Sequence, residues 1–201
     1  MSAAGAATQI SSPVERKALE LVDRERDRQV GIWGEQNHAL PCWIGILGEE
    51  YGELCEAISE TMLDDTYISK PELGGRSNIL EETVQFAAVA VQIMEYILRV
   101  SEVVPSREVR FKAYSIIADE ERERKIGTDN LGLLLGIIGK EFGDFCGAVV
   151  KQLVPDAVSG DDNGYMGVLV KLARTADVAI RMVEAVLRQY YPEEVNSNAN
   201  N

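Results

Sequence analysis

The sequence has few of the residues on which several classes of protein depend. Its three cysteines, Cys42, Cys55 and Cys146, form no Cys-x-x-Cys pair, so we expect reduced thiols, with Cys55 and Cys146 in the core. Residues 1–12 lack the basic and apolar regions of a signal peptide. No apolar run is expected to reach the length of a transmembrane helix. These absences favour a cytoplasmic protein with no membrane partner.

Positive charge is also scarce. The chain has 20 lysines and arginines against 33 aspartates and glutamates, which gives a net charge of −13. A surface this acidic disfavours non-specific binding to nucleic acid or to anionic membranes. It does not exclude a substrate that carries phosphate, because a bound metal ion reverses the local charge. We therefore expect no nucleic-acid partner.

Signals for β-strands are missing, whereas apolar residues recur at helical spacing along most of the chain. Pro13 begins a first helix, with Ser12 as its N-cap, and Gly31 is expected to end it after Val30. Four further helices are expected over about 42–63, 78–101, 131–151 and 164–189. The fold class predicted from this pattern is all-α.

Three segments recur in the same order, which indicates an internal duplication. Residues 25–31 match 121–127 at an offset of 96, and residues 48–55 match 139–146 at an offset of 91. The third helix matches about 164–189 at an offset of 89. The copy of the first helix, which ends near 121–127, is the sixth helix. The six helices would then form two tandem three-helix units, packed as a pseudo-dimeric bundle about an approximate two-fold axis.

The two units are expected to span 13–104 and 105–190, between disordered ends at 1–12 and 191–201. The helix over 42–63 and its copy are expected to pack near each other at the centre of the bundle. Small residues permit close helix approach, and the two helices carry them at matching positions, namely Gly48, Gly52, Gly139 and Gly143.

The most informative stretch of the first unit is acidic. Glu49, Glu50 and Glu53 share one face of the second helix, because residues three and four apart are neighbours on a helix. A second acidic pair, Glu81 and Glu82, begins the next helix. Antiparallel packing would bring these carboxylates around one hard divalent cation, which suits Mg²⁺ or Mn²⁺. The alternative interpretation is a solvated acidic face.

The second unit does not keep this chemistry. It retains Glu141 and Asp144, but basic or apolar residues replace the other acids. The replacements are Lys140 for Glu49, Val170 for Glu81, Lys171 for Glu82 and Arg174 for Gln85. The sequence thus predicts one intact acidic site and one basic, degenerate copy.

These motifs resemble those of the MazG-like, all-α nucleoside triphosphate pyrophosphohydrolases, which carry Glu-Glu-x-x-Glu on one helix and Glu-x-x-Asp on the next. The segment 49–53 matches the first motif in full, and Gln85 replaces the aspartate of the second. The stretch 33–38, Trp-Gly-Glu-Gln-Asn-His, resembles the loop that precedes the acidic helix in many small relatives.

The resemblance implies Mg²⁺-dependent cleavage of a nucleoside or deoxynucleoside triphosphate to the monophosphate and pyrophosphate. Glu50, Glu53, Glu82 and Gln85 would be metal ligands, with Glu49, Glu50 and Glu53 as the catalytic set. Glu49 would be either a ligand or the base for the attacking water. Relatives usually assemble, so a homodimer is also compatible with the resemblance.

Five residues are candidate substrate contacts, and each has a structural alternative. His38 could cap the loop, and Trp33 could be a core anchor rather than a stacking surface for a nucleobase; Gln36 lies between them. Lys171 and Arg174 could be solvated rather than phosphate-binding. Two other functions stay open: a catalytically weak nucleotide-binding or regulatory protein, and a purely structural bundle.

Overall fold

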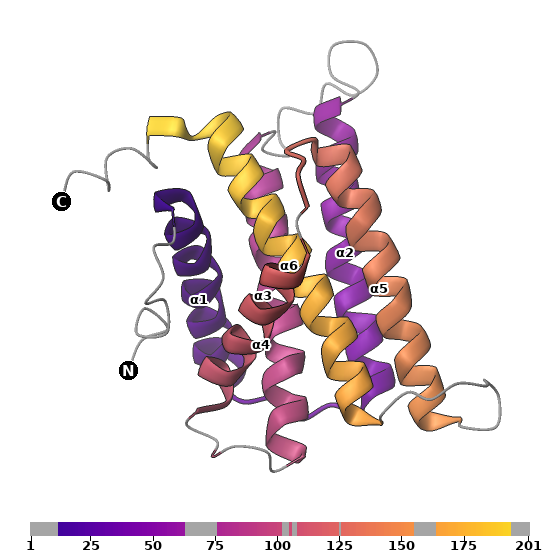
Figure 1. Cartoon of the computed structure of the whole chain (residues 1–201). Helices are drawn as coiled ribbons and strands as arrows, with labels where there is room; N and C mark the ends of the chain where they lie inside the picture. The colour runs from indigo at the N-terminus through magenta and orange to yellow at the C-terminus, as the bar shows by residue number, and fades with distance from the viewer. Residues whose placement is uncertain are drawn as a thin grey trace.

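The computed structural model describes residues 12–62, 76–101, 105, 108–124, 126–154 and 164–193 of the 201-residue chain. This part of the chain forms helices and contains no strand, which confirms the all-α prediction. In chain order the helices are α1 (Pro13–Trp33), α2 (Leu40–Met62), α3 (Arg76–Val100), α4 (Val109–Glu123), α5 (Leu131–Leu153) and α6 (Tyr165–Tyr190) (Figure 1).

The start of α1 follows the sequence signal, whereas its end does not. The Glu15 backbone N–H donates to the Ser12 hydroxyl at 3.2 Å, and the Ser12 N–H donates to the Glu15 carboxylate at 3.1 Å. This capping box confirms Ser12 as the N-cap. The prediction that Gly31 ends the helix is wrong, because α1 continues to Trp33. The residue that takes a left-handed backbone conformation is Gly34, with φ of 70°.

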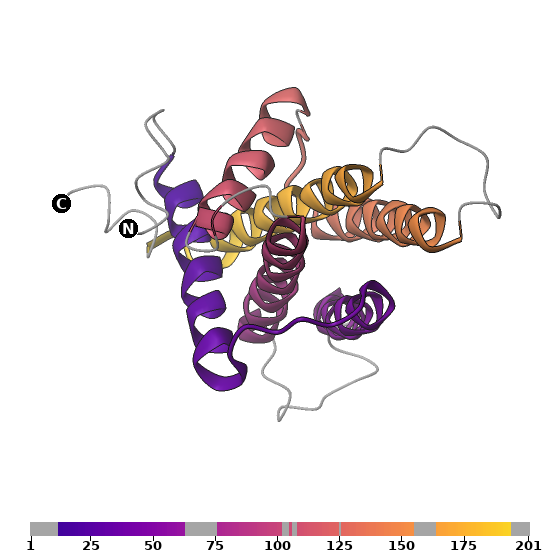
Figure 2. The ribbon, with the colours of Figure 1, turned by 90° about the horizontal axis from the view of Figure 1, so that it is seen from below.

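The centre of the bundle is the pair α3 and α6, which pack against each other. Seen from below, this pair lies between α1 and α4 on one side and α2 and α5 on the other (Figure 2). The prediction that α2 and α5 form the centre is therefore wrong. Both α3 and α6 are buried along most of their length, whereas α2 and α5 each keep an exposed face.

One prediction about α3 also needs correction. Its stretch Asn78–Val100 is long and apolar enough to cross a membrane, contrary to the prediction from the sequence. In the bundle, however, 72% of its most apolar window is buried against other helices. The apolar side chains of α3 therefore pack against the other helices in the protein core.

Where α2 and α5 touch, each helix places an aromatic side chain against a glycine of the other helix. A Cβ added to Gly48 would lie 3.6 Å from Cζ of Phe142, and one added to Gly139 would meet the hydroxyl of Tyr51. The two rings also pack against each other, with centroids 5.8 Å apart. Gly48 and Gly139 thus permit close approach as predicted, whereas Gly52 and Gly143 have no neighbour within 4 Å of such a Cβ.

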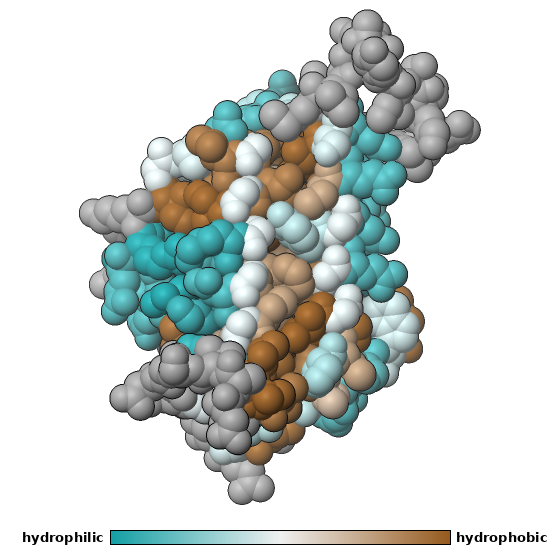
Figure 3. Space-filling model, turned by 90° about the vertical axis from the view of Figure 1, so that its right-hand side faces the viewer, coloured by the Kyte–Doolittle hydropathy of each residue, from teal (hydrophilic) through white to brown (hydrophobic). Residues whose placement is uncertain are grey.

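The outward face of α5 is partly apolar. Leu133, Val150 and Leu153 are exposed along it, and hydrophobic surface is visible on the side of the molecule that α2 and α5 form (Figure 3). The cysteines are less buried than predicted: all three are free, Cys42 is exposed, and Cys55 and Cys146 are half-buried.

Candidate metal centre

Three of the predicted acidic residues come together between α2 and α3. One carboxylate oxygen from each of Glu50, Glu53 and Glu82 lies within 4.8 Å of the other two. Glu50 and Glu53 are neighbours on one face of α2 because they are three residues apart. Glu82 reaches them because α3 runs antiparallel to α2, as the ring contacts Trp43–Tyr96 and Tyr51–Phe86 show. We call these three residues the carboxylate trio.

The trio is under electrostatic strain. Burial, and then the charges of Glu53 and Glu82, raise the pKa of Glu50 to about 7. Burial and the charge of Glu53 likewise raise the pKa of Glu82 to about 7. The Oε2 atoms of Glu50 and Glu82 are buried without a hydrogen-bond partner among the described residues. A cation placed among these oxygens would relieve both the repulsion and the missing contacts.

The chemistry of the donors indicates which cation would fit. All three donors are carboxylate oxygens, which are hard ligands, and no histidine or cysteine belongs to the group. No ion pair among the described residues brings a lysine or arginine to any member of the trio. Such a site suits Mg²⁺ or Mn²⁺, with water completing the coordination.

The other two predicted members of the acidic site lie at its edge. Glu49 is exposed, and its charge is among those that raise the pKa of Glu50, after burial and the charges of Glu53 and Glu82. The Gln85 side-chain amide donates to Oε1 of Glu81 at 3.4 Å. Gln85 therefore contacts the residue one turn before it on α3, on the side that faces α1.

The loop between α1 and α2 lies farther away. The His38 ring packs edge-on against Trp43 with centroids 5.0 Å apart, and Oε1 of Gln36 accepts from Gln92 at 2.9 Å. Trp43 precedes Glu50 by about two helical turns, or roughly 10 Å at the helical rise of 1.5 Å per residue. Trp33 is 55% exposed, which argues against a core anchor.

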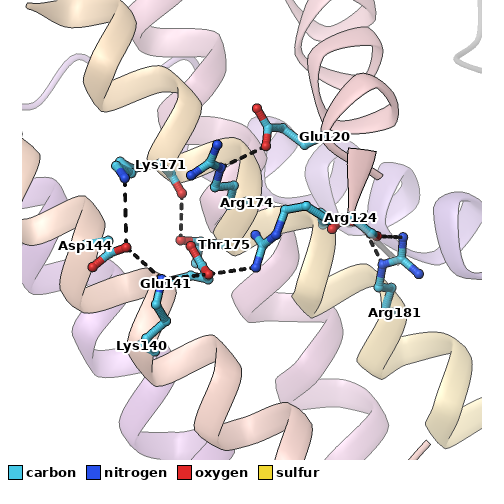
Figure 4. Close-up of polar contacts among 10 residues, drawn as sticks. Glu120, Arg124, Lys140, Glu141, Asp144, Lys171, Arg174, Thr175 and Arg181 are labelled. Carbon is cyan, nitrogen blue, oxygen red and sulfur yellow. Dashed lines mark hydrogen bonds and ion pairs between the residues drawn. The ribbon is translucent and has the colours of Figure 1, made fainter. Parts of the chain in front are cut away.

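In the second half, internal cations occupy the place that corresponds to the trio (Figure 4). Lys140 donates to Glu141 at 3.1 Å and to Asp144 at 2.9 Å. Lys171 lies 3.9 Å from the same Asp144 oxygen, and Arg174 pairs with Glu120 at 2.8 Å. The structure thus brings the predicted residues Lys171 and Arg174 together with acids of their own half.

Arg124 completes this second cluster. Its guanidinium donates to Glu141 at 2.8 Å, although Glu141 is almost fully buried. By the repeat offsets, Arg124 corresponds to Arg28 and Glu141 corresponds to Glu50. In the first half Arg28 binds Glu25 instead, at 2.7 and 2.8 Å, and no other lysine or arginine of the described residues forms an ion pair with Glu50.

Sequence reasoning missed the contribution of α1. The hydrogen bonds that Arg28 donates to Glu25 raise the pKa of Arg28, and the nearby charges of Glu81 and Glu50 add to this effect. The guanidinium also lies 5.9 Å from the centroid of the Trp33 ring. The sequence feature that indicates this contribution is the charged run at the end of the first helix, which is repeated at 121–127.

Beside the trio, α1 and α3 enclose an open cleft of about 440 Å³. From α1 it is lined by Leu21, Arg24, Glu25 and Arg28. From α3 it is lined by Leu80, Glu81, Val84 and Gln85, and Tyr191 lies just beyond the end of α6. The predicted disordered tail 191–201 thus begins with a residue that packs against the core, and 194–201 lie outside the described residues.

Comparison with protein-family models, with curated proteins and with solved structures gives no match.

Proposed function

We propose that the protein is a Mg²⁺-dependent hydrolase of nucleoside triphosphates that releases the monophosphate and pyrophosphate. The observation that carries this proposal is the convergence of Glu50, Glu53 and Glu82 within 4.8 Å. Three mutually repelling carboxylates that no lysine or arginine of the described residues pairs with are suited to hold a divalent metal ion. The resemblance of the motifs to those of MazG-like enzymes gives the proposal its reaction.

The residues of the chain have separate tasks in this proposal. Glu50, Glu53 and Glu82 hold the metal ion, and Mn²⁺ could replace Mg²⁺. When bound, such an ion neutralises phosphate oxygens and lowers the pKa of a water molecule. Glu49 is exposed next to Glu50, so its carboxylate is placed to accept the proton of the attacking water.

We also propose that the chain is an internal pseudo-dimer of MazG-like units over 13–104 and 105–190. Each packed helix pair of the first half has a counterpart in the second half. The helix α2 packs on α3 as α5 packs on α6, and α1 packs on α3 as α4 packs on α6. The contact of Gly48 with Phe142 likewise has its counterpart in the contact of Gly139 with Tyr51. Both observations support an approximate two-fold axis. The exposed apolar face of α5 is where we would expect a homodimer to form.

A panel of nucleoside and deoxynucleoside triphosphates with Mg²⁺, with pyrophosphate as the readout, tests the reaction. Glu50→Gln and Glu53→Gln should abolish turnover and leave the helical circular dichroism unchanged. Glu56→Gln is the matched control, because Glu56 is an exposed acid one turn further along the same helix. Turnover that persists in both trio variants would contradict the proposal.

One observation favours a second candidate, a nucleotide-binding or regulatory protein with weak activity. Gln85 stands where MazG-like relatives carry an aspartate, and its amide is bound to Glu81. An amide brings no negative charge, so the metal would be held by fewer charges. Nucleotide-dependent thermal stabilisation without turnover would select this candidate.

A further inference from the structure

We propose that the cleft between α1 and α3 binds the nucleoside end of the substrate, and that Arg28 binds a phosphate between this cleft and the carboxylate trio. This inference rests on the proposed function. It assigns a binding site to the nucleoside, which a metal site such as the trio would not recognise. It differs from the prediction from the sequence, which gave base recognition to the loop that contains Trp33 and His38.

The cleft has the size and lining of a site for a small organic group. Its volume of about 440 Å³ falls within the usual range for ligand sites, roughly 300–1,000 Å³. Leu21, Leu80 and Val84 form an apolar floor, and the Tyr191 ring stands at its edge. A planar base can bury its faces on such a floor and stack on an aromatic ring.

Polar groups in the cleft suit the edges of a nucleoside. Gln85 presents an amide, with a donor and an acceptor, and Glu81 presents a carboxylate acceptor. Base edges and ribose hydroxyls require this combination of donors and acceptors. The amide of Gln85 then has a use that an aspartate at the same position would not serve, because a carboxylate only accepts hydrogen bonds.

The cleft and the carboxylate trio lie on neighbouring faces of α3. Glu81 lines the cleft, and the next residue, Glu82, belongs to the trio. Glu25 and Arg28 of the cleft lie near enough to Glu50 for their charges to interact with it. A ligand with its base against Leu80 and Val84 could therefore direct its phosphates past Arg28 toward Glu50.

The second half shows how far an arginine at the position of Arg28 can reach. Arg124, its counterpart, extends to 2.8 Å from Glu141, the counterpart of Glu50. Arg28 begins from the same place in the first half but is held by Glu25, and its side chain is half exposed. A guanidinium that can turn from Glu25 toward the trio can bind a phosphate there through two parallel hydrogen bonds.

The experiment is a calorimetric titration of AMP, GMP, CMP and dTMP into the full-length protein in the presence of EDTA, so that binding does not depend on metal. At least one monophosphate should bind the wild type. Leu21→Trp, which fills the cleft from a half-buried position, and Tyr191→Ala should each weaken binding by about tenfold or more. Arg28→Gln should weaken it by a similar factor. Tyr190→Ala removes the same ring one residue away and should change the affinity by less than about twofold.

The inference and the proposed function can fail separately. Glu53→Gln should still bind the monophosphate in EDTA, because the trio is not needed for the nucleoside end. Binding to the cleft without turnover of any triphosphate would contradict the proposed hydrolase but not the cleft. The inference is overturned if no monophosphate binds the wild type, or if affinity is unchanged in both Leu21→Trp and Tyr191→Ala.

Discussion

Glu50 shows most clearly how residue chemistry and burial define the site. It lies on α2 among apolar neighbours, yet no basic side chain approaches it among the described residues, whereas its counterpart Glu141 binds both Arg124 and Lys140. The same backbone position therefore holds a paired carboxylate in one half and an unpaired one in the other. The unpaired carboxylate is the one that has a use for an external cation.

The metal-free protein should lose stability as the pH rises through the range where Glu50 ionises. Its pKa is about 7 in the folded protein against an ordinary value of 4.5, so the folded state binds the proton more tightly than the unfolded state. Stability should therefore fall between about pH 5 and about pH 7. Glu50→Gln should flatten this fall, as measured by urea unfolding in EDTA at several pH values.

The counterpart in the second half is the matched control for this prediction. Glu141→Gln removes a carboxylate that binds Arg124 at 2.8 Å and Lys140 at 3.1 Å. It should lower the free energy of unfolding at neutral pH by about 1–3 kcal/mol, because a half-buried guanidinium loses its partner. A loss of stability of the same size in Glu50→Gln would show that Glu50 is not repelled by its neighbours.

The prediction from sequence went furthest for the carboxylates themselves. The spacing of Glu50 and Glu53 on one helix and of Glu82 on the next was enough to predict their convergence, because helical geometry fixes which residues share a face. The ion pairs of Lys140, Lys171 and Arg174 could not be predicted, since long side chains choose among several partners. Arg28 was missed for the same reason.

At the scale of single helices, the regular spacing of apolar residues predicted where the helices lie. The glycine that ends a helix was harder to predict. The observed α2, α3, α5 and α6 begin and end within about two residues of their expected bounds, which is the usual uncertainty of helix ends. The end of α1 was misplaced because Gly31 and Gly34 are both near it, and only the backbone conformation distinguishes them. Sequence alone does not supply that conformation.

The packing of α2 on α5 yields a prediction about two glycines of one helix. Gly143→Ala should raise the free energy of unfolding by about 0.5–1 kcal/mol, because its Cβ meets nothing within 4 Å and alanine favours a helix. Gly139→Ala should instead lower it by about 1–3 kcal/mol, since the new Cβ would overlap the Tyr51 hydroxyl. Chemical denaturation of the two variants measures the difference.

A second substitution isolates the cause. Tyr51→Phe removes the hydroxyl that meets Gly139, so it should restore part of the lost stability in the Gly139→Ala background. Equal gains in Gly139→Ala and Gly143→Ala would mean that α2 and α5 do not approach closely at this point.

For the whole molecule, the sequence predicted the all-α class of the fold but not which helices form the centre. The glycines of α2 and α5 predict a central contact between these helices, whereas α3 and α6 occupy the centre. Glycine permits close approach but does not drive it. The many apolar side chains that α3 and α6 bury decide the matter, because their burial contributes more than a close backbone contact.

A buried ion-pair network joins the two halves. Glu95 on α3 accepts from Arg26 on α1 at 2.7 Å and from Arg110 on α4 at 2.8 Å, and Arg26 is 2% exposed. Glu95→Ala should lower the free energy of unfolding by about 3–5 kcal/mol, because it leaves a buried guanidinium without its partner. Thermal or chemical denaturation would measure this loss.

The repeat supplies the control. Glu184 corresponds to Glu95, but its partner Arg188 is 38% exposed and also binds Asp129. Glu184→Ala should therefore lower the free energy of unfolding by about 1 kcal/mol or less, as expected for an ion pair near the surface. Comparable losses in the two variants would show that Glu95 does not hold the halves together in the way described.

We propose that one half of the molecule binds a divalent metal ion through its carboxylates and that the other half uses its own cations instead. Electron paramagnetic resonance of Mn²⁺, titrated into the wild type, Glu53→Gln and Asp144→Asn, tests this difference between the halves. Asp144 is the counterpart of Glu53 and is bound to Lys140 at 2.9 Å. Glu53→Gln should lose Mn²⁺ affinity by at least about tenfold, whereas Asp144→Asn should retain it. Equal Mn²⁺ binding by wild type and Glu53→Gln, or loss of binding in Asp144→Asn alone, would show that the trio does not hold the metal ion.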